Sequence, residues 1–334
     1  MPQLSAPWLD AAKSAVRASI SQWGFSPSAK RELLCVSENA TFKVTDLDDR
    51  RRLAVRVYRP HYRSLHEVNS ELAWISAIRD GAVVPTPSIV STLDGQQVVE
   101  HGVDGQRIRL VAFEWLDGET LESEPPSPDH FQTMGRLTAH LHVHSSHWNG
   151  ADDLQRPRWD AEAMLGEDAL WGDWRKGSGL KKAELEVIEA ASSAARRRLD
   201  DFGIAEGRFG LIHADLRLAN LMHTPAGLAI IDFDDCGFGW YGYDFAASLS
   251  FIEHHSTASD FLAAWLKGYA SVRELGGVDL DMLPVFVMVR RLMLTAWLTS
   301  RASSDTALRF GRGFAAGTAE LSERFLRTGS PLMP

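Results

Sequence analysis

Cysteine is scarce in this chain, which has 334 residues and two cysteines, Cys35 and Cys236. Two thiols without a paired spacing argue against a disulfide framework and against a zinc site. The composition therefore disfavours small secreted domains and zinc-dependent folds. Because a reducing compartment fits such thiol usage best, we expect a cytoplasmic protein.

Positive charge and long apolar runs are also scarce. Lys and Arg number 35 against 44 Asp and Glu, which gives a formal net charge of −9. No overall positive field therefore attracts nucleic acid or an anionic membrane. The longest late apolar run, Leu283–Leu298, contains Arg290 and Arg291 and is shorter than the roughly 20 residues that cross a bilayer. We expect no nucleic-acid or membrane partner, and no heptad pattern indicates an oligomeric state.

The first third of the chain is rich in predicted strands. An amphipathic helix comes first, because Asp10 and Lys13 interrupt its apolar residues and argue against a secretory signal. Short β-branched or aromatic runs then predict strands within LLCVSENATFKVTD, RRLAVRVYRP, QQVVEHG and RIRLVAFEW. The inserted segment HEVNSELAWISAIRDG repeats its apolar residues at helical spacing. We expect residues 1–116 to form a small β-rich lobe with one inserted helix.

Helical patterns dominate the rest of the chain. Ser127 and Pro128 predict a cap and a first helical turn, and apolar residues continue along one stripe of the helix. The exception is residues 208–235, where FGLIHAD and GLAIIDFDD predict two short strands joined by a polar loop. We therefore expect residues 117–334 to form a mainly helical lobe, and the whole chain to adopt an α+β fold of two lobes.

The polar loop between these two strands carries the densest cluster of His, Asp and Asn. It reads H-A-D-L-R-L-A-N from His213 to Asn220, and Asp232 follows twelve residues later in I-I-D-F-D. Transfer of a phosphoryl group from ATP needs a carboxylate beside the attacking hydroxyl and oxygen ligands for magnesium. The spacing predicts Asp215 as the catalytic base and Asn220 and Asp232 as magnesium ligands, with ATP and Mg²⁺ as cofactors. A polar hairpin with a structural histidine is the alternative, but both halves of the motif, in order and each after an apolar strand, favour catalysis.

The β-rich lobe supplies candidate contacts for the nucleotide. Ser37 and Asn39 lie in S-E-N-A-T-F, a turn whose backbone amides are placed to cover phosphates although it lacks a glycine-rich pattern. Arg56 in L-A-V-R-V stands where the protein-kinase pattern V-A-I-K has lysine, and it is expected to reach phosphate. Glu71 on the following helix is the expected partner of Arg56, with a solvated helix face as the alternative.

The end of the last predicted strand of this lobe, F-E-W-L-D-G, is the expected hinge between the two lobes. Main-chain groups of Glu114 and Leu116 are predicted to contact the adenine of the nucleotide there. Because main-chain groups make these contacts, the identity of the two side chains matters little.

Three further patterns have plainer interpretations. G-F-G-W-Y-G, at residues 237–242, spells a dinucleotide fingerprint, but the aspartates just before it would repel a pyrophosphate and no alternating strand-helix pattern follows. Ordinary helix and cap roles are favoured for four histidines that no neighbouring carboxylate or cysteine completes into a metal site: His140, His142, His144 and His147. A substrate wall and the packing of a helical insert are equally good interpretations of four tryptophans: Trp148, Trp159, Trp171 and Trp174.

Taken together, the motifs resemble the aminoglycoside phosphotransferase and choline kinase-like superfamily, which includes type II homoserine kinases and bacterial stress-response kinases. The resemblance spans most of the chain and is carried by SENATFKV, LAVRVYRP, SELAWISAI before VPTP, FEWLDG, LTAHLHVH, HADLRLAN and IDFDDCGFGWYGYDFA. It implies a two-lobed, protein-kinase-like fold and an ATP-dependent kinase. By the same resemblance, Asp215, Asn220 and Asp232 inherit the base and magnesium roles, Arg56 and Glu71 anchor phosphate, and Asp244 supports the catalytic segment.

Two departures from the family pattern bear on the substrate. Ala214 replaces the usual glycine after the histidine, and this position should tolerate the small alanine side chain. Arg217-Leu218-Ala219 replaces the common H-P-G. Arg217 is a candidate catalytic residue, because a cation two positions after the base is placed to contact the transferred phosphoryl group or an anionic substrate group. Acidic and aromatic residues of the second lobe instead favour an amine: Asp160, Asp173, Trp171, Trp174 and Glu253.

The acceptor of the phosphate is therefore open among several small molecules. Amino alcohols, hydroxy amino acids, aminoglycosides and sugars all remain candidates. Only nine residues, 235–243, separate I-D-F-D from Asp244, which leaves no room for the long segment on which protein kinases seat a peptide. A Ser/Thr protein kinase and a catalytically silent nucleotide-binding regulator are the alternatives to a small-molecule kinase.

Overall fold

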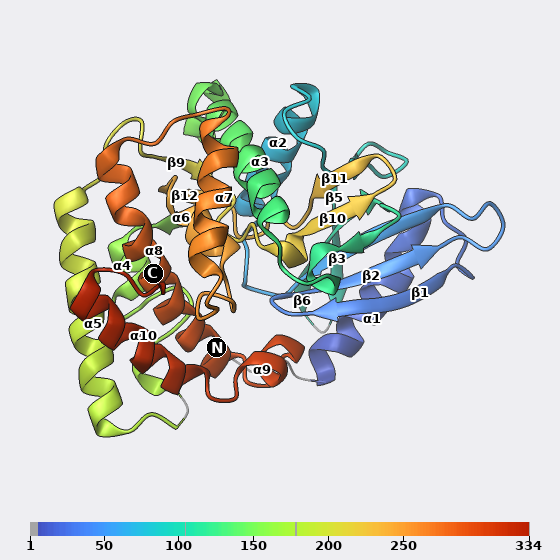
Figure 1. Cartoon of the computed structure of the whole chain (residues 1–334). Coiled ribbons are helices and arrows are strands. Elements are labelled where there is room, and N and C mark those ends of the chain that lie inside the picture. Colours follow the sequence, from blue (N-terminus) through green and yellow to red (C-terminus); the bar gives the residue numbers. More distant parts are fainter. Residues whose placement is uncertain (1–5, 104, 178, 334) are drawn as a thin grey trace.

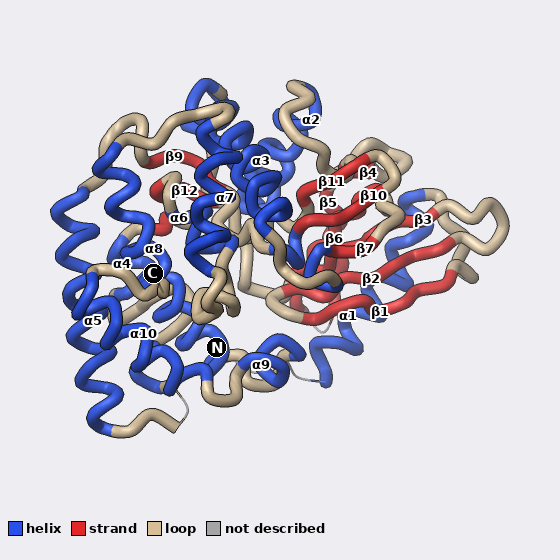
Figure 2. Tube along the Cα trace, viewed as in Figure 1, coloured by secondary structure: helices blue, strands red, loops and turns tan. Residues whose placement is uncertain are grey.

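The computed structural model describes residues 6–103, 105–177 and 179–333. A β-sheet region comes first in the chain and a mainly helical region follows it (Figures 1 and 2). The expected α+β class is therefore confirmed, since strands dominate the N-terminal part and helices the C-terminal part.

The N-terminal sheet is antiparallel, with its strands in the order β1-β2-β3-β6-β4 and with β5 also paired to β6. Its strands are β1 (Lys30–Val36), β2 (Asn39–Thr45), β3 (Arg52–Tyr58), β4 (Ile89–Val90), β5 (Val98–Val103) and β6 (Gln106–Glu114). Side chains alternate between the two faces of a strand. Val55 and Val57 consequently join the core that α1 (Ala6–Ser19) covers, whereas Arg56 faces the opposite side.

The helix inserted into the sheet region, α2 (Leu65–Asp80), forms where its apolar spacing predicts it. Ser64 caps it by accepting a hydrogen bond from the Glu67 backbone N–H at 3.1 Å, and the Glu67 carboxylate accepts one from the Ser64 N–H at 2.8 Å. This reciprocal capping satisfies two donors that the helix start leaves without partners. Leu72, Ile75 and Ile78 are buried, so the packed face of α2 fixes the position of its other residues, including Glu71.

The C-terminal region is built on long helices. They are α3 (Pro128–His147), α5 (Lys182–Phe202), α7 (Ala258–Ala270), α8 (Gly277–Ser300) and α10 (Phe314–Thr328), with the shorter α4 (Ala161–Leu165), α6 (Tyr243–Ser248) and α9 (Asp305–Phe310). Two glycines bring α3 and α7 into backbone contact: a Cβ on Gly268 would lie 1.8 Å from the Gln132 carbonyl oxygen, and one on Gly135 would lie 2.1 Å from that of Trp265. This close contact fixes α3, which carries a histidine of the site described below.

Helix α8 is longer than the apolar run that predicted it. It has 24 residues and is long and apolar enough to span a bilayer, so the expectation that this segment is too short is wrong. In this fold, however, 83% of its most apolar window is buried inside the protein. Helix α8 packs against α5, α6 and α10 as the central helix of its region, and it carries the buried charges of Arg290 and Arg291.

Short strands in the helical region hold the predicted catalytic segment. Two sheets of three strands have the orders β11-β10-β7 and β8-β12-β9. Their members are β7 (Glu119–Thr120), β8 (Arg158–Trp159), β9 (Phe209–Ile212), β10 (Leu221–Thr224), β11 (Gly227–Ile230) and β12 (Gly237–Trp240). The loop at 213–217 follows β9 and Asp232 follows β11, which belongs to the other sheet. The two halves of the motif meet where the Ile231 backbone N–H donates to the Asn220 carbonyl oxygen at 3.0 Å.

The glycines of G-F-G-W-Y-G pack against protein groups. A Cβ on Gly237 would lie 2.4 Å from the Pro157 carbonyl oxygen, and one on Gly239 would lie 2.6 Å from Cδ1 of Ile212. Their small size therefore serves strand packing, which agrees with rejecting a dinucleotide site at this sequence.

Candidate active site

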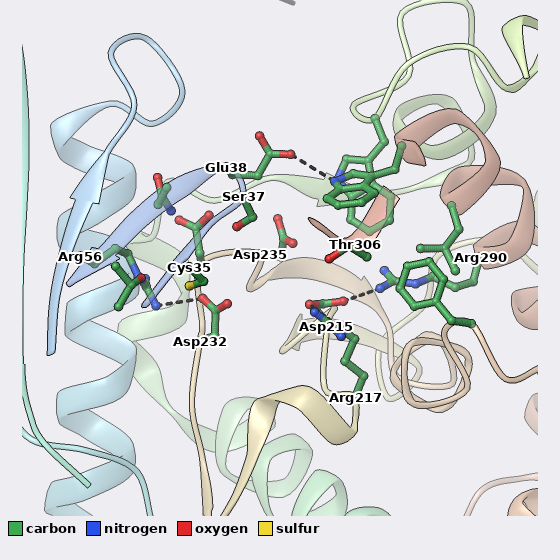
Figure 3. A pocket seen from close by; sticks show the side chains of 17 residues that line it. Cys35, Ser37, Glu38, Arg56, Asp215, Arg217, Asp232, Asp235, Arg290 and Thr306 are labelled. Atoms are coloured by element: carbon green, nitrogen blue, oxygen red, sulfur yellow. Dashed lines mark hydrogen bonds and ion pairs between the residues drawn. The ribbon is translucent and has the colours of Figure 1, made fainter. Parts of the chain in front are cut away.

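A polar cavity of about 100 Å³ lies between the sheet region and the helical region (Figure 3). The sheet side contributes the β1–β2 turn and β3, and the helical side contributes the loop after β9, the segment after β11 and α8. Predicted site residues that line it are Ser37, Asn39, Arg56, Asp215, Arg217 and Asp232. The structure thus brings together residues that are far apart in the sequence.

Asp215, the predicted base, has both carboxylate oxygens in hydrogen bonds. Its Oδ1 accepts from Nη2 of Arg290, and its Oδ2 accepts from Nδ2 of Asn220 at 2.9 Å and from Nε of Arg217 at 3.4 Å. Burial alone would raise the pKa of the Asp215 carboxyl, but Arg217, Arg290 and His213 outweigh it and lower this pKa below its ordinary value. Asp215 is therefore a carboxylate at neutral pH.

Asn220 is oriented by the loop that contains the base. Its side-chain nitrogen donates to the Asp215 main-chain oxygen at 2.8 Å and to the Asp215 carboxylate at 2.9 Å. Because the amide nitrogen is engaged in this way, the amide oxygen is the atom left to bind a cation. Asp232 is about half exposed and uses Oδ1 to accept from Arg56, which leaves Oδ2 as a second oxygen donor. An amide and a carboxylate oxygen are the donor types that Mg²⁺ prefers, so these residues fit that metal.

Arg56 makes the ion pair that its place on β3 predicts. Its Nη1 donates to Oε1 of Glu71, and its Nη2 donates to Oδ1 of Asp232 at 2.9 Å. Glu71 is fully buried, and its second oxygen accepts from the Tyr58 hydroxyl at 3.1 Å. The guanidinium is consequently held from two sides at the cavity wall, as Figure 3 shows for Asp232.

The β1–β2 turn is shorter than the predicted turn S-E-N-A-T-F. Ser37 and Glu38 form it, whereas Asn39 already belongs to β2. Asn39 is buried, and its side-chain oxygen has no hydrogen-bond partner among the described residues. Glu38, which sequence reasoning did not select, accepts from Nε1 of Trp297 at 3.1 Å and from Nε of Arg301, so the turn is tied to the end of α8.

The predicted hinge residues lie apart from this cavity. Glu114 is the last residue of β6, and its backbone N–H donates to the Ser88 carbonyl oxygen at 2.8 Å. Leu116 follows two residues later, and neither of the two is among the residues that line the cavity. Their predicted contact with adenine stays a prediction.

Asp244 braces the catalytic loop, as the family resemblance implies. Its Oδ1 accepts from the Ala214 backbone N–H at 2.7 Å, and its Oδ2 accepts from the His213 N–H at 3.1 Å. Nε2 of His142 on α3 lies 3.0 Å from Oδ2, and Nδ1 of the same ring lies 2.9 Å from the Tyr269 hydroxyl. Burial lowers the pKa of His142, which the contact with Asp244 partly offsets. His142 therefore has a bracing role that its helical spacing alone did not indicate.

Two further carboxylates follow Asp232 along the cavity. Asp234 is buried, and Arg63 approaches it at 3.8 Å and approaches Asp235 at 3.2 Å. Burial, opposed by Arg63 and reinforced by the carboxylates of Asp234, Asp215 and Asp232, raises the pKa of Asp235 to about 7. The cavity thus contains a carboxyl group that changes its charge near neutral pH.

The amine contacts proposed from composition mostly have other roles. Asp160 and Asp173 cap helices, and Glu253 pairs with Arg291 at 2.7 Å. Trp171 lines the cavity, whereas Trp174 is buried in the core. Burial and packing, which decide between a wall and a core role for an aromatic side chain, are not visible in the sequence.

Arg290 is the functional-site residue that sequence reasoning missed most clearly. In the sequence it interrupts an apolar run, yet in the structure it contacts the predicted base directly. The signal was a charge inside an otherwise apolar helix, because a charge that is buried needs a partner.

Comparison with known proteins shows the family of this chain. The model of the phosphotransferase enzyme family matches residues 36–275. The chain belongs to this phosphotransferase family. The predicted resemblance and the predicted class of enzyme, an ATP-dependent kinase, are confirmed, and the enzyme is a small-molecule phosphotransferase.

Individual relatives of this phosphotransferase cover nearly the whole chain. A solved structure of a microcompartment-associated aminopropanol kinase is 39% identical, has a TM-score of 0.87, and covers 95% of this chain and 98% of its own. The amicoumacin kinase of Bacillus subtilis (strain 168) is 22% identical over 325 residues, which are 93% of this chain and 90% of the relative.

A third similarity concerns the fold alone. A solved amicoumacin kinase in complex with AMP-PNP, Ca²⁺ and Ami is 19% identical, has a TM-score of 0.73, and covers 94% of this chain and 97% of its own. The two-lobed, kinase-like fold expected from the motifs is therefore confirmed.

Proposed function

We propose that this phosphotransferase moves the γ-phosphate of ATP to the hydroxyl group of a small amino alcohol. The observation that carries the choice of acceptor is the 39% identity to an aminopropanol kinase along 95% of the chain. Asp235, which lines the same cavity as Asp215 and pairs with Arg63 at 3.2 Å, is the proposed partner of the ammonium group.

The sheet side of the cavity is proposed to bind the nucleotide. Arg56, held in place by Glu71, contacts a phosphate, and the turn at Ser37 and Asn39 covers the phosphates, with the Ser37 N–H donating to the Asn39 carbonyl oxygen at 2.9 Å. Main-chain groups of Glu114 and Leu116 contact the adenine.

Asn220 and Asp232 are proposed to hold Mg²⁺ through oxygen atoms. The bound metal supplies charge neutralisation at the β- and γ-phosphates. Because Asn220 donates a hydrogen bond to Asp215, the position of the Asn220 side chain depends on the position of the proposed base.

The helical side is proposed to activate the acceptor. Asp215 accepts the proton of the hydroxyl group as the bond between the acceptor oxygen and the γ-phosphorus forms, while the bond from the γ-phosphorus to the β–γ bridging oxygen breaks and ADP leaves. Arg217 contacts the transferred phosphoryl group. Arg217 pairs with Asp215 at 3.4 Å and with Glu122 at 3.5 Å, which places its guanidinium beside the proposed base.

The test is ADP release with ATP and Mg²⁺ against amino alcohols, hydroxy amino acids, aminoglycosides and sugars. We expect the wild type to respond to an amino alcohol such as 1-amino-2-propanol and Asp232→Ala to be silent. Asp201→Ala, an exposed change at the end of α5, is the matched control and should behave as wild type. A stronger response to another class would overturn the proposed acceptor, and a response retained by Asp232→Ala would overturn the proposed metal ligand.

A further inference from the structure

Arg290 is a buried cation in the middle of α8. About 3% of its side-chain surface is exposed. It lies outside the residues that the family model matches, 36–275. Removing a guanidinium from water is costly unless hydrogen bonds and an opposite charge compensate it. The partners of Arg290 therefore indicate why the fold retains it.

The partners of Arg290 converge on the loop that contains the proposed base. Nη2 donates to Oδ1 of Asp215, and Nη1 donates to the Ala214 carbonyl oxygen at 3.1 Å. Two further hydrogen bonds go to side chains that do not line the cavity. Nη1 also donates to the Tyr243 hydroxyl at 3.1 Å, and Nε donates to the Ser250 hydroxyl at 2.9 Å. The Trp171 ring lies 4.6 Å from Cζ of Arg290 and covers the guanidinium.

These contacts restrict how the Asp215 carboxylate can turn. Ala214 has a φ of +65°, a conformation that a residue other than glycine rarely adopts, and Arg290 and Asp244 hold its carbonyl and amide groups. With Oδ1 engaged by Arg290, the other carboxylate oxygen is Oδ2, which accepts from Asn220 at 2.9 Å and from Arg217 at 3.4 Å. Figure 3 shows Arg290 and Asp215 side by side in the lining of the cavity, joined by a dashed line.

We propose that Arg290 is a positioning residue, which orients the Asp215 carboxylate so that Oδ2 faces the acceptor hydroxyl. The inference rests on the proposed role of Asp215 as the base. Misplacement of a catalytic group by about 1 Å can reduce the rate by about 10²-fold, so Arg290, which itself lines the cavity, contributes to turnover by fixing the rotamer of Asp215.

The neighbouring Arg291 provides a matched control. It is buried to the same extent on the same helix, but it donates to Glu253, Thr318 and the Phe314 carbonyl oxygen. None of these partners is among the residues that line the cavity. Loss of Arg291 therefore reports the cost of removing a buried arginine from α8 without disturbing Asp215.

The experiment compares Arg290→Gln, Arg290→Lys and Arg291→Gln in steady-state ADP release, with thermal unfolding as a check on folding. We expect Arg290→Gln to lower kcat by about 10²-fold with KM for ATP within about twofold of wild type. Arg290→Lys keeps a donor to Asp215 and should recover part of the loss. If Arg290→Gln does not fold, Arg290→Lys must still lower kcat at unchanged KM. Arg291→Gln should lower stability and leave kcat near wild type.

A double-mutant cycle decides whether Arg290 acts through Asp215. In an Asp215→Asn background, Arg290→Gln should cause little further loss, because the group that it positions is already disabled. An equal loss in both backgrounds would overturn the inference, as would an Arg290→Gln enzyme with wild-type kcat.

A crystal structure of Arg290→Gln separates this inference from the proposed function. We expect Asp215 to adopt another rotamer in the variant, whether or not any acceptor is turned over. Silence of the wild type with every acceptor would refute the proposed function alone. An unchanged Asp215 rotamer would refute the positioning role alone.

Discussion

The sheet region and the helical region hold the charges of the cavity in different ways. On the sheet side, Arg56 is fixed by Glu71, which is 15 positions later in the chain and on the next helix. On the helical side, Oδ1 of Asp215 is held by Arg290, which is 75 positions later, on α8, with α6 and α7 between them in the chain. The guanidinium on the sheet side thus takes one partner from the next helix and another, Asp232, from the helical region, whereas the proposed base takes its Oδ1 partner from a distant helix.

This contrast predicts that damage to the helical side affects the chemical step most. Asp215→Asn should lower kcat by roughly 10²–10⁴-fold, the usual effect of losing general acid–base help, with ATP binding preserved. Steady-state kinetics combined with ATP titration checks both parts. Weakened ATP binding at unchanged kcat would reverse the assignment of the two sides.

Damage to the sheet side should instead affect nucleotide binding and stability. Glu71→Ala leaves Arg56 buried with Asp232 as its remaining carboxylate partner. We expect KM for ATP to rise roughly tenfold, because a tenfold loss of affinity corresponds to the free energy of about one charge-assisted hydrogen bond. Breaking a buried pair should also lower the free energy of unfolding by about 3 kcal/mol. Denaturant unfolding measures this loss, with Asp80→Ala, an exposed change on the same helix, as the control. Equal effects of the two variants would contradict the role of the pair.

The smallest expected effect concerns Asp235, between the two sides. Because burial raises its pKa to about 7, this carboxyl is mostly neutral at pH 6 and mostly ionised at pH 8. KM for an amino alcohol, which stays cationic over this range, should therefore fall as pH rises, by roughly threefold to tenfold. Kinetics at several pH values check the trend, and Asp235→Asn should remove it. A KM that is independent of pH in the wild type would exclude Asp235 as the partner of the ammonium group.

Sequence reasoning was strongest where a structural signal is local. The apolar spacing and the Ser64 cap predicted α2, and the alternation in L-A-V-R-V placed Arg56 on the face opposite the α1 core. The order of Asp215, Asn220 and Asp232 after two short strands also predicted which segments meet. Each of these signals depends on consecutive residues, whose side-chain directions the backbone period determines.

Sequence reasoning was weakest where a residue acquires its role from distant partners. Arg290 was read as a break in an apolar run, His142 as an ordinary helix residue, and the β1–β2 turn as longer than it is. The length of α8 was also underestimated, because its ends are more polar than its centre.

By itself, the sequence determined the α+β class, the family and the order of the catalytic motif. The tertiary structure alone decided that Arg290 holds the proposed base, that His142 and Asp244 brace its loop, and that α8 is tied to the β1–β2 turn through Glu38. The physical reason is that secondary structure follows from local periodicity, whereas a buried charge takes its partner from whichever element the packing of the helices brings beside it.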